Sequence, residues 1–256
     1  MSLLSLSHYN RWQAGAAHLL VSAIVGIAVM ATMILVWYPR PYFEAAGGNA
    51  LVLLMVGIDI ALGPLLTLAV YNPGKGLGRL RFDLVAIAIF QLIALSYGIH
   101  VMFQARPAYL VFAVDRFDLV MANMLADAEL AKAPPPWNSR PRGRPPTVGA
   151  RVPSDPTLKE ESLFLALSGI DLPQQPRFFV PFEEVAGEAA KKARPLAELR
   201  RLNPGSTEID DVVRRSGRDE AALAFLPARA PNRDFAVIVD AATGNIVDKR
   251  LLAPWK

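Results

Sequence analysis

A carboxyl, a glycine and a hydroxyl recur at helical spacing inside one long apolar stretch. Residues 50–71 hold a single charged side chain, Asp59, and are long enough to cross a bilayer core of about 30 Å at about 1.5 Å per residue. Asp59, Gly63 and Thr67 are spaced i, i+4 and i+8, so on a helix they share one face. In an apolar medium such a face indicates either close helix packing around a hydrogen-bonded carboxyl or a path for a proton.

The same stretch carries features that shape this face. Pro64 removes a backbone donor and frees the carbonyl of Ile60, which predicts a kink. We expect the kinked face to open as a groove into which a helix of another protein docks. The residues of this groove are Gly57, Asp59, Gly63, Pro64 and Thr67. The alternative is that Asp59 only fixes a three-helix bundle through one hydrogen bond, worth about 0.6 to 2 kcal/mol.

Candidate partners for Asp59 lie on a later apolar run, residues 82–103. Asp59 is about 9 residues from the start of its own stretch, and the same depth counted back from the end of that run reaches residue 94. Gln91, Ser96 and Tyr97 surround that level and are the candidate intramembrane partners. His18 lies near the opposite end of its own run, where we expect it to reach water.

Three apolar runs, residues 15–37, 50–71 and 82–103, fill the first 106 residues and predict a membrane domain of three transmembrane helices. The first run ends at interfacial aromatics and Pro39 without a small-residue cleavage site, so we read it as an uncleaved helix. Basic residues flank the cytoplasmic ends of such helices. Arg11 and the cluster Lys75, Arg79 and Arg81 outweigh Arg40 in the intervening loop. This predicts an inner-membrane protein with a cytoplasmic N-terminus and residues 107–256 in the periplasm.

The composition of residues 107–256 excludes several kinds of site. The chain has no cysteine, and its histidines, His8, His18 and His100, all precede residue 107, so Ser-His-Asp and Cys-His catalysis and the usual zinc sites are ruled out there. The 21 basic and 20 acidic residues of this part balance, which argues against a nucleic-acid-binding face. The basic, glycine-rich loop 74–81 lacks the Lys-Ser/Thr of a phosphate-binding loop. We expect no catalytic residue, no metal and no cofactor.

Residues 107–256 predict an α+β domain with an antiparallel sheet. Apolar segments 109–114 and 117–122 flank Asp115-Arg116 as a β-hairpin, and a second hairpin closes the chain through Gly244. The remaining expected strand is 222–226, and the hairpin strands at the end are 235–240 and 245–252. Expected helices are 125–132, 157–167, 182–192, 195–202 and 206–216. A Pro/Arg-rich loop, residues 134–156, is expected to be stiff, extended and on the surface, and a ligand for a proline-recognising partner is the alternative.

Several motifs in order along the chain resemble one known family. They are Trp37-Tyr38-Pro39, Gly57-Ile-Asp59-Ile-Ala-Leu-Gly63-Pro64-Leu-Leu-Thr67, Phe82-Asp83-Leu84, Arg106-Pro107-Ala-Tyr109 through Asp115-Arg116-Phe117, Val180-Pro181-Phe182-Glu183-Glu184, Ala193-Arg194-Pro195-Leu196 and Asp240-Ala241-Ala242-Thr243-Gly244. Together they are similar to the type IV pilin accessory proteins of the TfpX/TfpZ group. The resemblance implies an inner-membrane, chaperone-like protein that binds a cognate major type IV pilin during pilus assembly, alongside other assembly components. It implies no catalytic residue.

Two other functions remain open at this point. Asp59 would serve a small transporter or proton-coupled device, although three helices and one carboxyl provide few groups to line a transport pathway. A membrane-anchored sensor or enzyme is the third class, and the acids Asp115, Asp118 and Asp240 lie at strand turns, where solvated carboxylates are common. We expect a pilin-binding protein in which membrane helices meet the apolar helix of the pilin and the outer domain meets its globular head.

Overall fold

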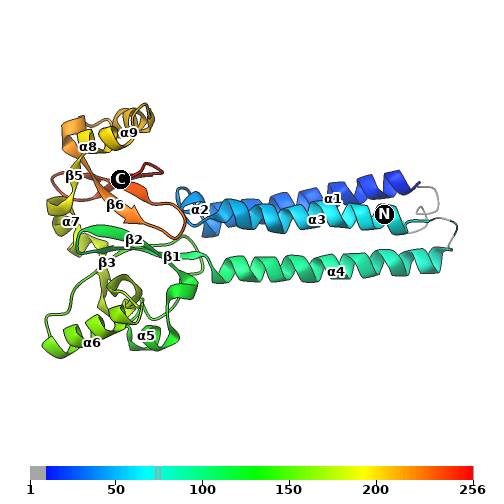
Figure 1. The fold of residues 1–256 in the computed structure, drawn as a ribbon, viewed down its shortest axis with the longest axis horizontal. Helices are drawn as coiled ribbons and strands as arrows, with labels where there is room; N and C mark the ends of the chain where they lie inside the picture. The colour runs from blue at the N-terminus through cyan, green and yellow to red at the C-terminus, as the bar shows by residue number, and fades with distance from the viewer. Residues whose placement is uncertain (1–9, 73, 75, 256) are drawn as a thin grey trace. The chain divides into compact units, whose positions relative to one another are not determined.

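The computed structural model describes residues 10–72, 74 and 76–255 and divides them into two compact units. The helical unit falls within residues 1–35 and 49–104, and the sheet unit comprises residues 36–48 and 105–256 (Figure 1). Side chains of residues 50, 51, 53–61 and 77 lie outside the description. The predictions for Gly57 and Asp59 fall on them.

The helical unit consists of three long helices. They are α1 (Arg11–Thr32), continued by a π-helical turn over Met33–Trp37, α3 (Gly48–Val70) and α4 (Leu77–Gln104). A capping box starts α1, because the Asn10 side chain accepts from the Gln13 N–H at 2.9 Å and the Gln13 side chain accepts from the Asn10 N–H at 3.0 Å. Pro64 lies inside α3.

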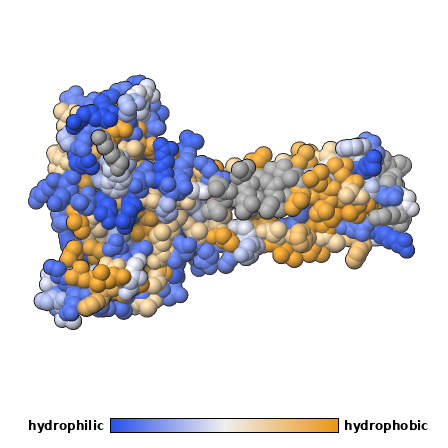
Figure 2. Space-filling view, viewed as in Figure 1, coloured by the Kyte–Doolittle hydropathy of each residue, from blue (hydrophilic) through white to orange (hydrophobic). Residues whose placement is uncertain are grey.

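Apolar side chains cover the outside of α1 and α4. Leu20, Ile27, Phe90 and Ile93 are each more than 60% exposed, and Figure 2 shows this apolar surface. Within the described residues, two helical segments, Arg11–Trp37 and Gly78–Gln104, are long and apolar enough to cross a membrane. The third expected span coincides with α3, and its crossing of a membrane stays a prediction.

The sheet unit is built on one eight-stranded mixed sheet. The strand order is β4-β3-β1-β2-β6-β7-β8, and β5 pairs with β6. The strands are β1 (Pro107–Ala113), β2 (Arg116–Met121), β3 (Thr147–Ala150), β4 (Phe179–Pro181), β5 (Arg194–Pro195), β6 (Leu223–Arg229), β7 (Phe235–Asp240) and β8 (Ile246–Arg250).

The expectation of an antiparallel sheet is wrong at two joins. The pairs β1–β3 and β2–β6 are parallel, whereas β1–β2, β3–β4, β5–β6, β6–β7 and β7–β8 are antiparallel. Tight turns join only β1 to β2 and β7 to β8 among the expected strands. Long connections containing helices precede β3 and β6, and such connections allow a strand to return in the parallel sense.

Both expected hairpins are present. In the first, Leu110 lies opposite Leu119 and Ala113 opposite Arg116, with Val114 at the turn in a left-handed conformation of φ +63°. In the second, Gly244 has φ +74°, and a Cβ there would lie 1.8 Å from the carbonyl oxygen of Ala186. Only glycine therefore fits this turn.

Five α-helices accompany the sheet close to the expected positions. They are α5 (Asp127–Lys132), α6 (Pro156–Leu167), α7 (Ala186–Lys192), α8 (Leu196–Leu202) and α9 (Glu208–Ser216). Short 3₁₀ turns separate them: η4 (Ala122–Met124), η5 (Leu172–Gln174), η6 (Pro176–Phe178), η7 (Phe182–Glu184) and η8 (Glu220–Ala222). Helices α8 and α9 pack Leu199 and Val212 against Phe225 and Ile238 of the sheet.

The Pro/Arg loop lies at the surface as expected, with residues 134–136, 138, 139, 142 and 144 exposed, but it runs through turns and bends and is held to the sheet unit rather than extended. Arg106, 2% exposed, donates from Nε and Nη2 to the carbonyl of Pro141 at 2.9 and 2.6 Å. Tyr109 donates its hydroxyl proton to the carbonyl of Ser139 at 2.9 Å, and the ring of Trp137 packs on Tyr109 and Phe179. The physical reason is that the buried guanidinium requires acceptors, which the loop carbonyls supply. The loop also contains β3, which the sequence analysis missed.

Candidate functional site

A partly buried polar contact joins the three long helices. His18 Nδ1 of α1 lies 2.6 Å from Thr67 Oγ1 of α3, and His18 Nε2 lies 2.7 Å from Gln91 Oε1 of α4. With the Gln91 oxygen as acceptor, a neutral His18 donates from Nε2 and accepts the Thr67 hydroxyl proton at Nδ1. The expectation that His18 reaches water is therefore wrong. Counting residues from the end of each apolar run estimates the depth of a side chain but does not show which side chains of different helices face one another.

Gly63 marks where α4 packs closely on α3. A Cβ at Gly63 would lie 2.0 Å from Gln91 Nε2, and one at Gly15 of α1 would lie 2.8 Å from Leu68 Cγ. Thr67 is 1% exposed. Glycines thus allow the helices of this unit to approach one another, and the faces at Gly63 and Thr67 are filled by Gln91 and His18 rather than open.

The other residues predicted for the intramembrane site separate from this contact. Pro64 is buried within α3, whereas Ser96 is exposed and Tyr97 is 70% exposed. Gly57 lies within α3, but its surroundings and the side chain of Asp59 lie outside the description, so the partner of Asp59 stays a prediction. The surroundings of His18 were predicted wrongly from the sequence. The available signal was its position three residues after Gly15 on α1, which places both residues on one face of the helix.

The segment between α1 and α3, here called the connector (residues 36–48), belongs to the sheet unit. It contains the short helix α2 (Tyr42–Ala45). The ring of Tyr42 packs on Phe235 with centroids 5.9 Å apart, and the N–H groups of Asn232 and Arg233 donate to the Ala45 carbonyl at 3.0 and 3.1 Å. From the sequence, this segment was expected to be only a loop between two helices.

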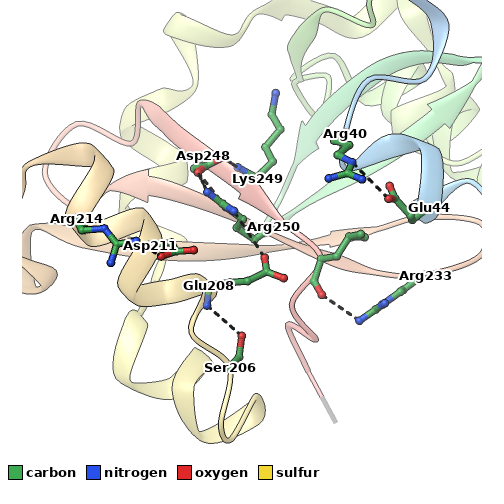
Figure 3. Close-up of polar contacts among 11 residues, drawn as sticks. Arg40, Glu44, Ser206, Glu208, Asp211, Arg214, Arg233, Asp248, Lys249 and Arg250 are labelled. Atoms are coloured by element: carbon green, nitrogen blue, oxygen red, sulfur yellow. Dashed lines mark hydrogen bonds and ion pairs between the residues drawn. The ribbon is translucent and has the colours of Figure 1, made fainter. Parts of the chain in front are cut away.

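Charged pairs secure the outer strand β8 beside the connector (Figure 3). Arg250 lies 2.8 Å from Asp248 and 3.9 Å from Glu208 of α9. Arg233 donates to the Leu251 carbonyl at 3.1 Å. Lys249 stacks on the Tyr42 ring at 5.5 Å, and burial lowers its pKa. These contacts hold β8 at the edge of the sheet. Charged side chains on an edge strand also discourage pairing with a strand of another chain.

A pocket of about 290 Å³ lies in the sheet unit at the end of β6. It is lined by Asp118, Leu119, Val120, Met124, Asp171, Pro173, Gln174, Arg229, Ala230 and Pro231. Asp118 is 6% exposed and accepts from Arg116 Nε at 3.2 Å and Arg229 Nε at 2.8 Å. Burial raises the pKa of Asp118, and the two guanidinium groups act in the opposite direction. The pocket therefore combines apolar walls with a carboxylate whose charge is balanced by two guanidinium groups.

Helix α6 presents apolar side chains outward. Leu163, Phe164 and Leu167 are 59%, 61% and 84% exposed, and Figure 2 shows apolar surface over this helix. Glu161 of the same helix is 43% exposed and pairs with Arg177 at 3.0 Å. In the part of the chain that the structure covers, three or more His, Cys, Asp or Glu side chains nowhere gather as a metal site would require.

Comparison with known proteins gives a consistent family. Residues 7–47 match the family model described as "Fimbrial assembly protein FimB". The chain is 30% identical over 226 residues to "Fimbrial assembly protein, serogroup E1" of Dichelobacter nodosus, covering 87% of this chain and 88% of that protein. It is 32% identical over 181 residues to "Fimbrial assembly protein, serogroup I" of the same organism, covering 71% and 70%. No solved structure matches.

These relatives bear on the family expected from the sequence motifs. The expectation of a pilus assembly protein is confirmed, whereas the narrower TfpX/TfpZ assignment stays a prediction. The alignment with the serogroup E1 protein is long enough to include parts of both the helical and the sheet unit. The chain belongs to the fimbrial assembly protein FimB family.

Proposed function

We propose that the chain is an inner-membrane, chaperone-like accessory protein that binds a cognate major type IV pilin and supports its assembly. The observation that carries this proposal is the similarity to fimbrial assembly proteins over 87% of the chain, which extends through both units. The outward apolar surfaces of α1 and α4 support a membrane location, because such side chains are costly in water. The pilin helix meets the helical unit, and the pilin head meets the sheet unit.

Only part of the groove predicted on α3 is kept in this proposal. Gln91 and His18 occupy the space beside Gly63 and Thr67, so these two positions are left out of the proposed docking face. The surroundings of Gly57 and Asp59 lie outside the description, and docking there stays a proposal. Asp59→Asn keeps a hydrogen-bonding group and removes the charge. Normal piliation with Asp59→Asn is expected if Asp59 acts through hydrogen bonding, and loss of piliation would favour the proton-coupled alternative.

The test of pilin binding uses the complete chain. A tagged chain, extracted from membranes in mild detergent, is expected to recover the pilin, and deletion of its gene is expected to remove surface pili seen by electron microscopy. Complementation with the unchanged gene is the control. Normal pili in the deletion strain, together with no recovery of pilin, would overturn the proposal.

The location is tested separately with engineered cysteines, which are clean probes because the chain has none. A membrane-impermeant thiol reagent is expected to label Ser206→Cys in intact spheroplasts. Lys75→Cys is expected to react only after lysis. The reverse pattern would contradict a periplasmic sheet unit.

A further inference from the structure

We propose that exposed arginines of the sheet unit bind the phosphate groups of anionic membrane lipids at the points where the chain passes between this unit and the long helices. These arginines, here called the arginine collar, are Arg40, Arg142 and Arg233, and all three belong to the sheet unit. The inference rests on the membrane location in the proposed function. It depends neither on pilin binding nor on the side of the membrane that the sheet unit occupies.

Arg40 lies beside the end of the first long helix. It is three residues after Trp37, where the π-helical turn that continues α1 ends, so their Cα atoms are at most about 11 Å apart. The Arg40 side chain is 86% exposed. Glu44, whose Oε1 lies 3.7 Å from Arg40 Nε, is only 24% exposed, so the positive group of this pair is the one that faces outward.

Arg142 is held beside the end of α4 by a buried neighbour. Arg106 is two residues after Gln104, the last residue of α4, and donates to the Pro141 carbonyl at 2.9 and 2.6 Å. This anchor is at most about 7 Å of chain from the end of the helix. Arg142 follows Pro141 directly and is exposed, and a Cβ at Gly143 would meet no atom within 4 Å. The loop is therefore open at Arg142.

Arg233 lies beside the start of α3. Its N–H donates to the Ala45 carbonyl at 3.1 Å, and Ala45 is three residues before Gly48, where α3 begins. The Arg233 guanidinium donates to the Leu251 carbonyl at 3.1 Å, which is a neutral acceptor and leaves the positive charge in place. Both carboxylate oxygens of the adjacent Asp234 accept from other N–H groups, at 2.9 and 2.7 Å. Each of the three junctions with the long helices thus carries an exposed arginine.

Positive charge is concentrated around the junction at Arg106. Residues 134–150 contain three arginines and no acid, although Asp127 pairs with one of them, Arg140, at 2.7 Å. Burial lowers the pKa of Arg106, and the nearby charges of Arg140 and Arg142 act in the same direction. Guanidinium groups bind phosphate through paired hydrogen bonds, and basic residues within about 8 Å of a membrane surface attract anionic lipids. The chemistry of the collar therefore fits lipid phosphates.

Energy transfer to labelled lipids tests this preference. The full chain, with a fluorescent donor on Gly143→Cys, is reconstituted without pilin in phosphatidylcholine nanodiscs that contain an acyl-labelled acceptor lipid. Half-maximal transfer is expected at an about fivefold lower mole fraction of acceptor phosphatidylglycerol than of acceptor phosphatidylcholine, which is the effect of about one arginine at an anionic surface. About 0.5 M sodium chloride should reduce the difference. Equal transfer to the two acceptors would overturn the inference.

Removal of charge identifies the residues responsible. The collar variant carries Arg40→Gln, Arg142→Gln and Arg233→Gln, and it is expected to lose the preference for phosphatidylglycerol. The matched control removes the same charge at three exposed positions of α8 and α9, through Arg201→Gln, Arg214→Gln and Arg215→Gln. This control is expected to keep the preference. An equal loss in both variants would show an effect of net charge alone and would contradict the collar.

Pilin recovery separates the lipid from the pilin as the occupant. The collar variant is expected to recover as much pilin as the unchanged chain. Loss of pilin recovery, together with no lipid preference in the unchanged chain, would assign these arginines to an acidic face of the pilin and overturn the inference. Failure of the unchanged chain to enter nanodiscs would instead remove the membrane location in the proposed function, and this inference with it.

Discussion

The two units of this chain place their polar groups in opposite ways. In the helical unit His18 bonds a threonine and a glutamine of two other helices, while apolar side chains such as Leu20 and Phe90 face outward. In the sheet unit Phe117, Phe225 and Phe235 are fully buried, and the surface carries ion pairs. A buried Leu or Phe side chain is favoured over an exposed one in water by about 1.5 to 3 kcal/mol. The difference therefore favours an apolar surrounding for the helical unit.

The largest expected effect tests burial of charge in the sheet unit. Arg106→Met is expected to cost about 3 kcal/mol or more of stability, because the Pro141 carbonyl loses two charged donors. Limited thermolysin digestion of the full chain in detergent should then cut around Trp137 much faster. Arg142→Met, at an exposed position of the same loop, is the control. Equal digestion of both variants would show that the Pro/Arg loop is not held by Arg106.

A smaller effect tests close packing in the helical unit. Gly63→Ala is expected to cost about 1 to 3 kcal/mol, because its Cβ meets the Gln91 side chain and must displace it. Gly78→Ala, where a Cβ meets no atom within 4 Å, is expected to be neutral or slightly stabilising. The midpoint of thermal aggregation in detergent measures both. A Gly63→Ala protein as stable as the Gly78→Ala protein would mean that the two helices do not approach closely.

The polar contact between helices is expected to contribute less than its geometry suggests. A double-mutant cycle of His18→Leu and Thr67→Val should give a coupling of about 0.6 kcal/mol, up to about 1.7, which is the range found for hydrogen bonds between the helices of a membrane protein. Denaturation in detergent with increasing sodium dodecyl sulfate supplies the free energies. Additive effects of the two substitutions would argue against the 2.6 Å contact.

The smallest expected effect is a pH dependence at the closing hairpin. Asp240 accepts from the Thr243 and Ala242 N–H groups, and these bonds hold its pKa below the usual value. Its stabilising contribution is therefore present above the unfolded pKa of about 3.9 and is lost as the pH falls through the lower folded pKa. Asp240→Asn should make the acid-side decline in the thermal midpoint shallower. An unchanged decline would exclude Asp240 as a contributor.

Local patterns were enough to predict much of the fold. The Asp115-Arg116 turn between two apolar segments predicted β1 and β2, and Gly244 predicted the hairpin of β7 and β8. Helix α9 was found from its boundary signals, because Ser206 followed by Glu208 marks a helix start and Ser216-Gly217 marks an end, and Gly217 does end it in a left-handed conformation. These elements are specified by residues near one another in the sequence.

Features that depend on distant residues were not predictable in the same way. The parallel joins of β1 to β3 and of β2 to β6 depend on where long connections return. Strand β5 has only two residues, too few for an alternation of apolar and polar side chains to be recognised in the sequence. Within the candidate sites, the contact of His18 with Thr67 spans 49 residues, and the side chain that meets Gly63 comes from another helix. Helix-to-helix register is set by packing and leaves no local pattern.

The connector has a consequence for the order of events during synthesis. Asn232 bonds the Glu44 carbonyl across 188 residues, and Phe235 covers Tyr42, so this part of the sheet unit closes only after almost the whole chain has been made. Contacts of such long sequence separation form slowly, since the loop between them must be closed first. A ribosome-bound chain that ends before β7 therefore lacks the Phe235 ring that packs on Tyr42, and the last strands set the time at which this part of the sheet unit can fold.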